Sequence, residues 1–255
     1  MIESATLFVG PSLDGISEMA RGLRRSVHGQ IAQAIGQRII AGEYAPGSIL
    51  PTEDVFSNSF AVSRTSLREA IKGLAAKGLV ESRPKIGTRV RPRAQWNMLD
   101  PDVSDWAFSS PLNRAHGRAL FELRQIIEPA AAALSAERRD KADLANMREG
   151  WAGMAAATSR DEWIGPDLRF HQAILASTRN DLLISLGHLL GPSLTHTFAI
   201  VNVDARRRAI SVPRHRDILL AIERRDPGAA RAAMALLLQE ALVDLEEMLE
   251  IETQK

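Results

Sequence analysis

The order of local signals in residues 21–93 constrains the fold of this chain more than any other feature. Apolar residues recur every four positions and predict a first helix over about 26–41. Thr52 is placed to cap a short second helix and Ser63 to cap a third. Two extended runs within 79–91 flank a turn and predict a β-hairpin. Helix, helix, turn, helix and hairpin in about 70 residues is the plan of a winged helix-turn-helix.

The same segment is strongly basic. Residues 21–93 contain 13 Lys/Arg and 5 Asp/Glu, a formal charge near +8, although the whole chain of 255 residues carries only +1. A basic module joined to a mildly acidic remainder is typical of a protein whose first part meets a polyanion. A solvated basic face is the alternative explanation.

The start of the third helix has residue types that suit DNA reading. Arg64 and Arg68 lie one turn apart and project from one side, where an arginine can contact guanine or phosphate. Serine and threonine hydroxyls suit phosphates near a helix N-terminus, and a glycine permits a tight, basic hairpin tip. The predicted DNA contacts are Ser63, Arg64, Thr65, Ser66, Arg68, Arg83, Lys85 and Gly87. A basic surface helix in an unrelated helical domain would show part of the same pattern.

Residues 46–90 resemble the DNA-binding domain of the GntR family of regulators. The markers are Pro46-Gly47, Leu50-Pro51-Thr52-Glu53, Val62-Ser63-Arg64, Leu67-Arg68-Glu69-Ala70 and Gly87-Thr88. This resemblance implies that Arg64 and Arg68 are the principal DNA contacts, assisted by the wing. Some members carry an arginine directly after the glutamate of the second helix. Asp54 stands there in this chain, so that contact is expected to be absent and the operator to differ.

Beyond Pro111 nearly every segment predicts helix. The expected helices are 112–139, 141–158, 161–177, 181–201, 213–225 and 227–251. Pro192 is expected to kink or break the fourth of these. The predicted fold is therefore mainly α: an N-terminal winged helix-turn-helix followed by an all-α helical bundle.

Three residues of the bundle form a candidate metal set. Asp167 and His171 are four apart on a predicted helix and share a face, and His215 follows on a later helix. A carboxylate with neutral imidazoles is a normal ligand set for a divalent metal. A surface or interhelix hydrogen bond between Asp167 and His171 is the alternative.

The helical half is similar to the FCD ligand-binding domain of the FadR branch of this family. The markers are Leu123-Arg124, Glu128-Pro129, Asp167-Leu168-Arg169-Phe170-His171, Asn180, His215 and Asp226. The resemblance implies a metal held by one Asp and three His, with an effector carboxylate beside it. Leu237 stands where the fourth ligand is expected and cannot coordinate. Either three ligands hold a Zn, Ni or Mn class ion with effector and water, or no metal binds; His196 is a candidate substitute.

Arg124 is the expected anchor for an effector. An arginine on the inner face of a bundle needs a partner, and a bidentate carboxylate is the natural one. A structural ion pair with a nearby glutamate is the alternative. Asn180, Thr195 and His196 are expected to add contacts. The linker 92–106 is similar to that of sugar-acid regulators, including repressors of galactonate operons, which implies a sugar acid such as galactonate as effector.

The expected organisation is a flexible tail (1–20), a DNA-binding domain (21–93), a linker with a short helix (94–110) and an effector-binding and dimerisation domain (111–255). We expect a cytoplasmic homodimer, with no membrane partner, that represses from a palindromic double-stranded operator. The chain has no cysteine. A metal-dependent enzyme acting on a small acid through Asp167, His171 and His215 is the alternative function. A DNA-binding architectural protein without a ligand is a third reading.

Overall fold

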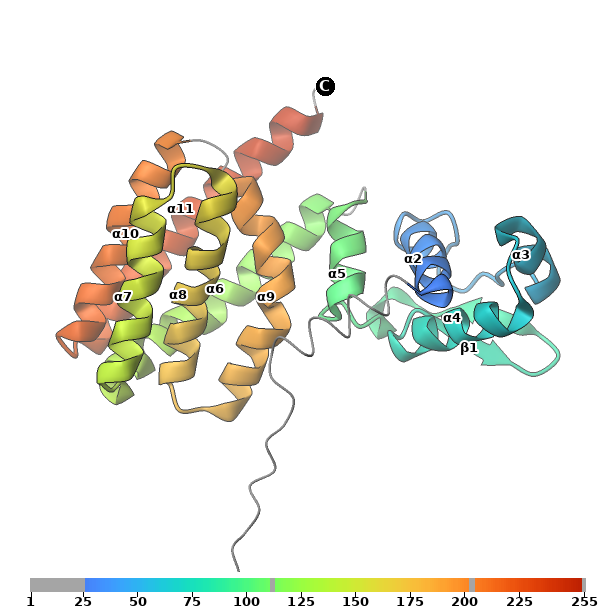
Figure 1. Cartoon of the computed structure of the whole chain (residues 1–255), viewed down its shortest axis with the longest axis horizontal. Coiled ribbons are helices and arrows are strands. Elements are labelled where there is room, and N and C mark those ends of the chain that lie inside the picture. Colours follow the sequence, from blue (N-terminus) through green and yellow to red (C-terminus); the bar gives the residue numbers. More distant parts are fainter. Residues whose placement is uncertain (1–25, 111–112, 202–204, 254–255) are drawn as a thin grey trace, which may run out of the picture. The chain divides into compact units, whose positions relative to one another are not determined.

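The computed structural model describes residues 26–110, 113–201 and 205–253 (Figure 1). The expected tail (1–20) lies outside these residues. The chain divides into two compact units, Met1–Asn97 and Met98–Lys255. None of the described helices is both long and apolar enough to span a bilayer.

The first unit follows the predicted order of helices and hairpin. Its elements are α2 (Val27–Ile40), α3 (Glu53–Phe60), α4 (Arg64–Ala76), β1 (Val80–Arg83), β2 (Gly87–Val90) and the 3-10 turn η1 (Arg93–Gln95). Ser26, Thr52 and Ser63 cap the three helices by accepting backbone N–H groups. Ile35, Ile39 and other apolar side chains of α2 pack against α4 and are fully buried. The winged helix-turn-helix is therefore confirmed.

The wing is a two-stranded antiparallel sheet in which Val80 pairs with Val90 and Arg83 with Gly87. Gly78 ends the preceding helix with φ +76°, a left-handed conformation that favours glycine. A Cβ added there would lie 2.4 Å from the Gln95 carbonyl oxygen, so η1 fits directly over this glycine. The end of α4 and the close packing of η1 thus both depend on Gly78.

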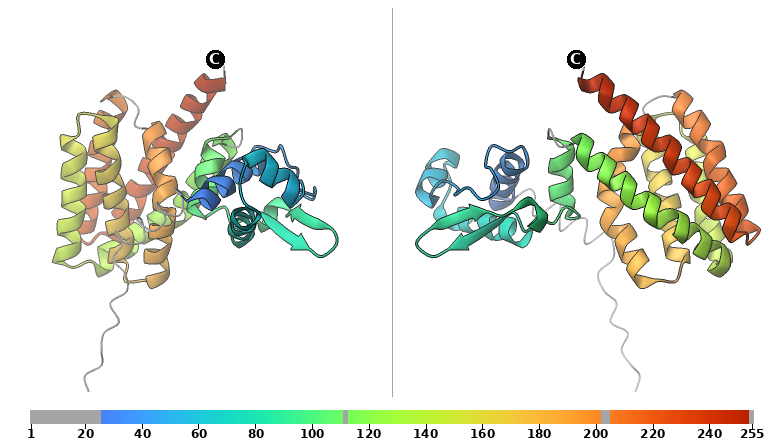
Figure 2. Two further views of the ribbon diagram at one scale, coloured as in Figure 1. Left: turned by 45° about the vertical axis from the view of Figure 1, so that its right-hand side comes forward. Right: turned by 180° about the vertical axis from the view of Figure 1, so that it is seen from behind.

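The second unit is a bundle of helices. Its elements are α5 (Pro101–Phe108), α6 (Asn113–Arg138), α7 (Lys141–Ala156), α8 (Arg160–Ser177), α9 (Asp181–Val201), α10 (Ala205–Glu223) and α11 (Pro227–Thr253). The long helices α6 and α11 run side by side, and α7 packs along α8 (Figure 2). Trp163, Phe170, Met147 and Met154 are buried in the shared core. The all-α bundle is as predicted.

Two prolines lie inside helices of this bundle. Pro192 does not break α9. The helix start expected at Pro213 is wrong, because α10 begins at Ala205, eight residues earlier. An internal proline costs about 3 kcal/mol in an isolated helix. Tertiary packing offsets that cost here, because Leu190, Leu194 and Phe198 are buried on α9.

Candidate nucleic-acid interface and metal pocket

The first turn of α4 presents the predicted DNA-reading residues on an exposed face. The side chains of Arg64 and Arg68 are 67% and 63% exposed. Ser63 caps the helix, and its Oγ accepts the N–H of Ser66 at 3.1 Å. Thr65 is exposed between them. The capping bond fixes the backbone at the point where the arginines project. Because both arginines are exposed, both can contact the same binding partner.

Each of these arginines is paired with an acidic residue from the first turn of α3. Arg64 Nη2 lies 2.7 Å from Asp54 Oδ1, and Arg68 Nε donates to the two Glu53 carboxylate oxygens at 2.9 and 3.1 Å. Exposed pairs of this kind contribute about 0–1 kcal/mol. The arginines are therefore oriented without being buried.

The hairpin tip presents the remaining predicted DNA contacts. Arg83 ends β1, Lys85 has φ +64° and Gly87 begins β2 with φ +107°. All three are exposed, and Arg83 pairs with Glu81 at 2.8 Å. An exposed basic tip of this shape is suited to phosphate contacts along a groove edge.

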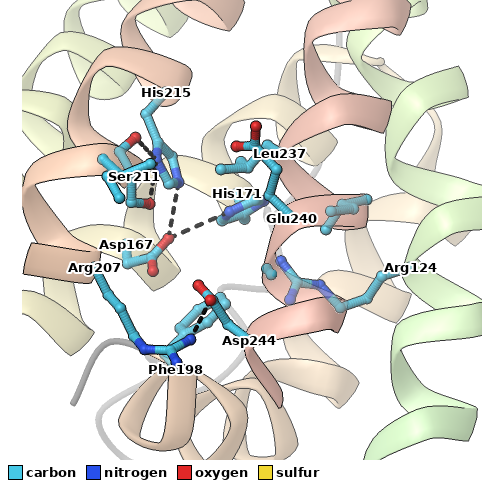
Figure 3. Close-up of a pocket in the computed structure, with 13 residues that line it drawn as sticks. Arg124, Asp167, His171, Phe198, Arg207, Ser211, His215, Leu237, Glu240 and Asp244 are labelled. Atoms are coloured by element: carbon cyan, nitrogen blue, oxygen red, sulfur yellow. Dashed lines mark hydrogen bonds and ion pairs between the residues drawn. The ribbon is translucent and has the colours of Figure 1, made fainter. Parts of the chain in front are cut away.

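In the second unit, α8 and α10 bring the three candidate metal ligands together (Figure 3). Asp167 and His171 project from one face of α8, and His215 faces them from the middle of α10. All three side chains are buried, and one ligand atom of each lies within 4.8 Å of the others. Asp167 Oδ1 is 3.3 Å from His171 Nε2 and 3.2 Å from His215 Nε2. The predicted set is thus brought together around one carboxylate oxygen.

Neighbouring groups orient these ligands. His215 Nδ1 lies 2.9 Å from the Ser211 carbonyl oxygen, which can only accept, so Nδ1 carries a proton and Nε2 is the nitrogen that faces Asp167. Trp163 Nε1 donates to Asp167 Oδ2 at 2.8 Å. His171 Nδ1 lies 2.6 Å from Glu128 Oε2. A histidine held at one nitrogen by a carbonyl or carboxylate is the usual support of a metal ligand.

A divalent cation fits this arrangement. Asp167 Oδ1 and His215 Nε2 are fully buried and have no hydrogen-bond partner among the described residues. A buried carboxylate oxygen that lies 3.2 Å from an imidazole nitrogen requires a cation or a proton between the two atoms. Leu237, at the position expected for a fourth ligand, lines the same cavity and leaves that side of the set apolar.

The cavity beside this set has about 460 Å³ of empty space, including its open mouth. Phe198 forms one wall and stacks on His171, with ring centroids 5.6 Å apart. Toward the mouth, Arg207 pairs with Asp244 and with Glu247 at 2.9 Å, and Arg214 pairs with Glu240 at 2.6 Å. The sequence-based prediction missed these pairs. Their only signal was a polar face on the last helix at spacings of three and four residues.

Arg124 lines the cavity but is also paired within the protein. Its Nε donates to Glu128 Oε1 at 2.8 Å, and its side chain is only 3% exposed. The guanidinium lies 5.0 Å from the centroids of Phe121 and Phe198. No other hydrogen bond of Arg124 is formed with the described residues, so the terminal nitrogens are available to a ligand. The two roles considered for Arg124 are therefore compatible.

Three residues expected to contact the effector do not line this cavity. Asn180 caps α9, its Oδ1 accepting the Leu182 N–H at 3.0 Å. Thr195 Oγ1 donates to the carbonyl oxygen of Gly191, which lies in the same helix. His196 Nε2 lies 2.8 Å from Asp105 of α5, which also excludes it as the substitute metal ligand in this conformation.

The buried charges shift one another's pKa values. Burial opposes ionisation of Glu128, but the charges of Arg124 and His171 more than offset it and lower its pKa to about 2. Burial likewise disfavours charged His171, yet Glu128 and Asp167 raise its pKa to about 9. Burial opposes ionisation of Asp167 too, but the adjacent imidazoles of His171 and His215 lower its pKa far below the usual range. Both carboxylates are therefore ionised at neutral pH.

Residues 28–90 match the family "Bacterial regulatory proteins, gntR family", and residues 119–240 match the FCD domain. The chain is 36% identical over 212 residues to the HTH-type transcriptional regulator YieP of Escherichia coli, covering 81% of this chain and 90% of that protein. It is 32% identical over 221 residues to the galactonate operon transcriptional repressor of Escherichia coli, covering 86% and 96%.

Among solved structures, the chain resembles Lar, described as controlling the expression of the Listeria monocytogenes agr system. The TM-score is 0.63 at 18% identity, over 88% of this chain and 98% of that one, which supports the fold. The sequence relatives are transcription regulators, so the enzyme alternative is not supported. The chain therefore belongs to the gntR family of bacterial transcription regulators and carries an FCD domain behind its DNA-binding domain.

Proposed function

We propose that this regulator is a repressor that binds a palindromic operator as a homodimer and is released by a sugar acid, with galactonate as the first candidate. Residues 21–93 bind DNA, residues 94–110 form a linker with a short helix, and residues 111–255 bind the effector and dimerise. Relatives that include the galactonate operon repressor and the Uxu and Exu regulators support this effector class.

The observation that carries the proposal is the convergence of Arg124 with Asp167, His171 and His215 on one cavity. Burying four such groups is costly even when they pair with one another, so their position around one cavity favours a ligand that uses them. A protein that only shapes DNA has no need of this cavity, which argues against an architectural role. A divalent cation held by the Asp and the two His would supply a Lewis-acid anchor for the effector carboxylate, beside the Arg124 guanidinium.

Helix α9 links the cavity to helix α5. On one face Phe198 stacks on His171, and on another His196 holds Asp105 of α5. Helix α5 is the first helix after the chain leaves the DNA-binding unit. An effector that displaces Phe198 would therefore move α9 and α5 together.

This link is tested at His196. The variant His196→Ala should bind DNA and effector normally but should no longer release DNA when the effector binds. The control His188→Ala, an exposed change on the same helix, should release DNA as the wild type does. Normal release in His196→Ala would reject this link.

The recognition helix is tested with a duplex that the wild-type protein selects from a random-sequence library. In a mobility-shift assay, Arg64→Ala should lose sequence-specific binding because it removes a contact to base edges. The control is Arg38→Ala, which removes an exposed arginine of α2 that is paired with Glu43. Sequence-specific binding that survives Arg64→Ala would reject the assignment of the recognition helix.

The effector site is tested by calorimetry with a panel of sugar acids. Binding should be lost in Arg124→Ala and retained in Arg118→Ala, which removes an exposed arginine on the same helix. Zinc binding should be lost in Asp167→Asn and retained in Asp161→Asn, an exposed residue of the same helix. Unchanged sugar-acid affinity in Arg124→Ala would reject the proposed carboxylate anchor.

A further inference from the structure

The first turn of α3 is acidic at a place where acidic residues are unfavourable. In a helix-turn-helix, the helix before the recognition helix crosses the DNA backbone. The N-terminus of such a helix normally attracts anions, including phosphates. Here Glu53 and Asp54 occupy that turn, and their side chains are 44% and 63% exposed. Two uncompensated carboxylates at this position would repel the phosphate backbone.

The recognition arginines compensate both charges. Asp54 Oδ1 lies 2.7 Å from Arg64 Nη2, and Glu53 accepts from Arg68 Nε. The Asp54 contact uses one terminal nitrogen of Arg64, and Arg64 forms no other hydrogen bond or ion pair with the described residues. Its remaining N–H donors stay open to a base edge. The pair thus neutralises the acid and fixes one edge of the guanidinium.

We infer that Asp54 is a specificity-determining residue that stays paired with Arg64 on DNA, presenting the guanidinium to a base edge and withholding it from the phosphate backbone. This inference rests on the proposed operator-specific binding and deepens it. Without Asp54, Arg64 can turn to a phosphate, which strengthens binding to any sequence. Asp54 therefore favours discrimination between DNA sequences over affinity for DNA of any sequence.

This role of Asp54 should affect two measurable quantities: the salt dependence of DNA binding and the discrimination between DNA sequences. If Arg64 turns to a phosphate, the salt dependence of binding rises, adding about 0.9 to the slope of log K against log salt concentration. Loss of an oriented arginine–base contact reduces discrimination by roughly tenfold. A residue that only supported the fold would change neither quantity while the protein remained folded.

The experiment compares two duplexes, one selected by the wild-type protein from a random library and one scrambled from it. Fluorescence anisotropy gives the affinity of the full chain for each duplex over a range of salt concentrations. The variants are Asp54→Asn, which removes the charge at nearly constant shape, and Asp54→Glu, which keeps it. Glu43→Gln is the matched control, because it removes a carboxylate paired with Arg38, outside the recognition helix. Thermal unfolding verifies that each variant folds.

We expect Asp54→Asn to bind the scrambled duplex several-fold more tightly, with a steeper salt slope and a selected-to-scrambled ratio reduced about tenfold. Asp54→Glu should recover most of the ratio, and Glu43→Gln should match the wild type. An unchanged ratio and slope in folded Asp54→Asn would overturn the role of Asp54. If the wild-type protein selects no sequence at all, the proposed operator binding itself fails, which is a different result.

Discussion

Replacing Glu128 with glutamine should destabilise the second unit and do so in a pH-dependent way. Glu128 Oε1 accepts from Arg124 Nε at 2.8 Å, and Oε2 lies 2.6 Å from His171 Nδ1. The side chains of Arg124 and Glu128 are 3% and 7% exposed. Removing the carboxylate charge leaves a buried guanidinium without its counter-ion, which is among the costliest single changes in a protein core.

Two approaches give similar magnitudes. Breaking a buried ion pair costs about 3–5 kcal/mol. Independently, the pKa of Glu128 falls from 4.5 to about 2. A change of one in pKa corresponds to about 1.4 kcal/mol, so the charge contributes about 3 kcal/mol. For a domain the size of the second unit, a loss of that order lowers the melting temperature by roughly 6–20 °C.

The pH dependence follows from the direction in which folding moves this pKa. Because the pKa is lowered on folding, the stabilisation is fully present above about pH 4.5 and is lost as the pH falls through about 2. The difference in unfolding free energy between wild type and Glu128→Gln should therefore be about 3 kcal/mol at neutral pH and less than half of that at about pH 3.

Urea unfolding of the full chain, followed by tryptophan fluorescence, measures this difference because Trp163 is fully buried in the second unit. Glu137→Gln is the control, since it changes an exposed glutamate on the same helix. A Glu128→Gln variant as stable as the wild type at neutral pH, or a difference that does not change with pH, would refute the assignment of a buried charge pair.

Three further outcomes follow from particular residues. The raised pKa of His171, about 9, means that zinc binding at about pH 7.5 should release a proton; calorimetric heats independent of buffer ionisation would contradict this. Gly78→Ala places a Cβ 2.4 Å from the Gln95 carbonyl oxygen at φ +76°, so it should destabilise the first unit by at least about 1–2 kcal/mol and weaken DNA binding while zinc binding persists. Gly150→Ala brings a Cβ to 3.0 Å from the Phe170 amide nitrogen and should lower the melting temperature of the bundle by separating α7 from α8, with a cost of about 1–3 kcal/mol.

The first unit was predictable because its signals are local. Each helix begins at a Ser or Thr that accepts a nearby N–H, and Gly78 marks a helix end with its positive φ. The pairing of Arg64 with Asp54 was not predictable, because it joins two helices whose angle the sequence does not specify. Residue types and spacing thus identified the interface but not its internal ion pairs.

In the second unit, prediction succeeded where ligands share a helix and weakened across helices. Asp167 and His171 are an i, i+4 pair, whereas His215 was added to them by residue type and family resemblance rather than by spacing. Pro213 suggested a helix start, yet α10 already begins at Ala205 because bundle packing tolerates an internal proline. That error hid the first turn of α10, and with it the contribution of Arg207 to the cavity.

Thr195 and His196 lie outside the cavity for a physical reason that concerns their helix. Helix α9 packs against α8 on one side and α5 on another, so both polar and apolar residues are buried around it. A helix buried on more than one face shows no single apolar stripe, so its sequence does not indicate which side chains face the cavity. Thr195 and His196 were therefore assigned to the cavity, although Phe198 is the residue of that turn that lines it.

The charges of the cavity tie effector binding to the metal. Arg124 carries one positive charge, Glu128 and Asp167 carry one negative charge each, and the rim arginines are already paired with carboxylates. In the metal-free cavity a protonated His171, with a pKa of about 9, brings the sum of these buried charges to zero. A divalent cation that displaces this proton makes the sum positive, which attracts a carboxylate. Chelation should therefore weaken galactonate binding by more than about tenfold. Unchanged affinity after chelation would mean that Arg124 alone holds the effector.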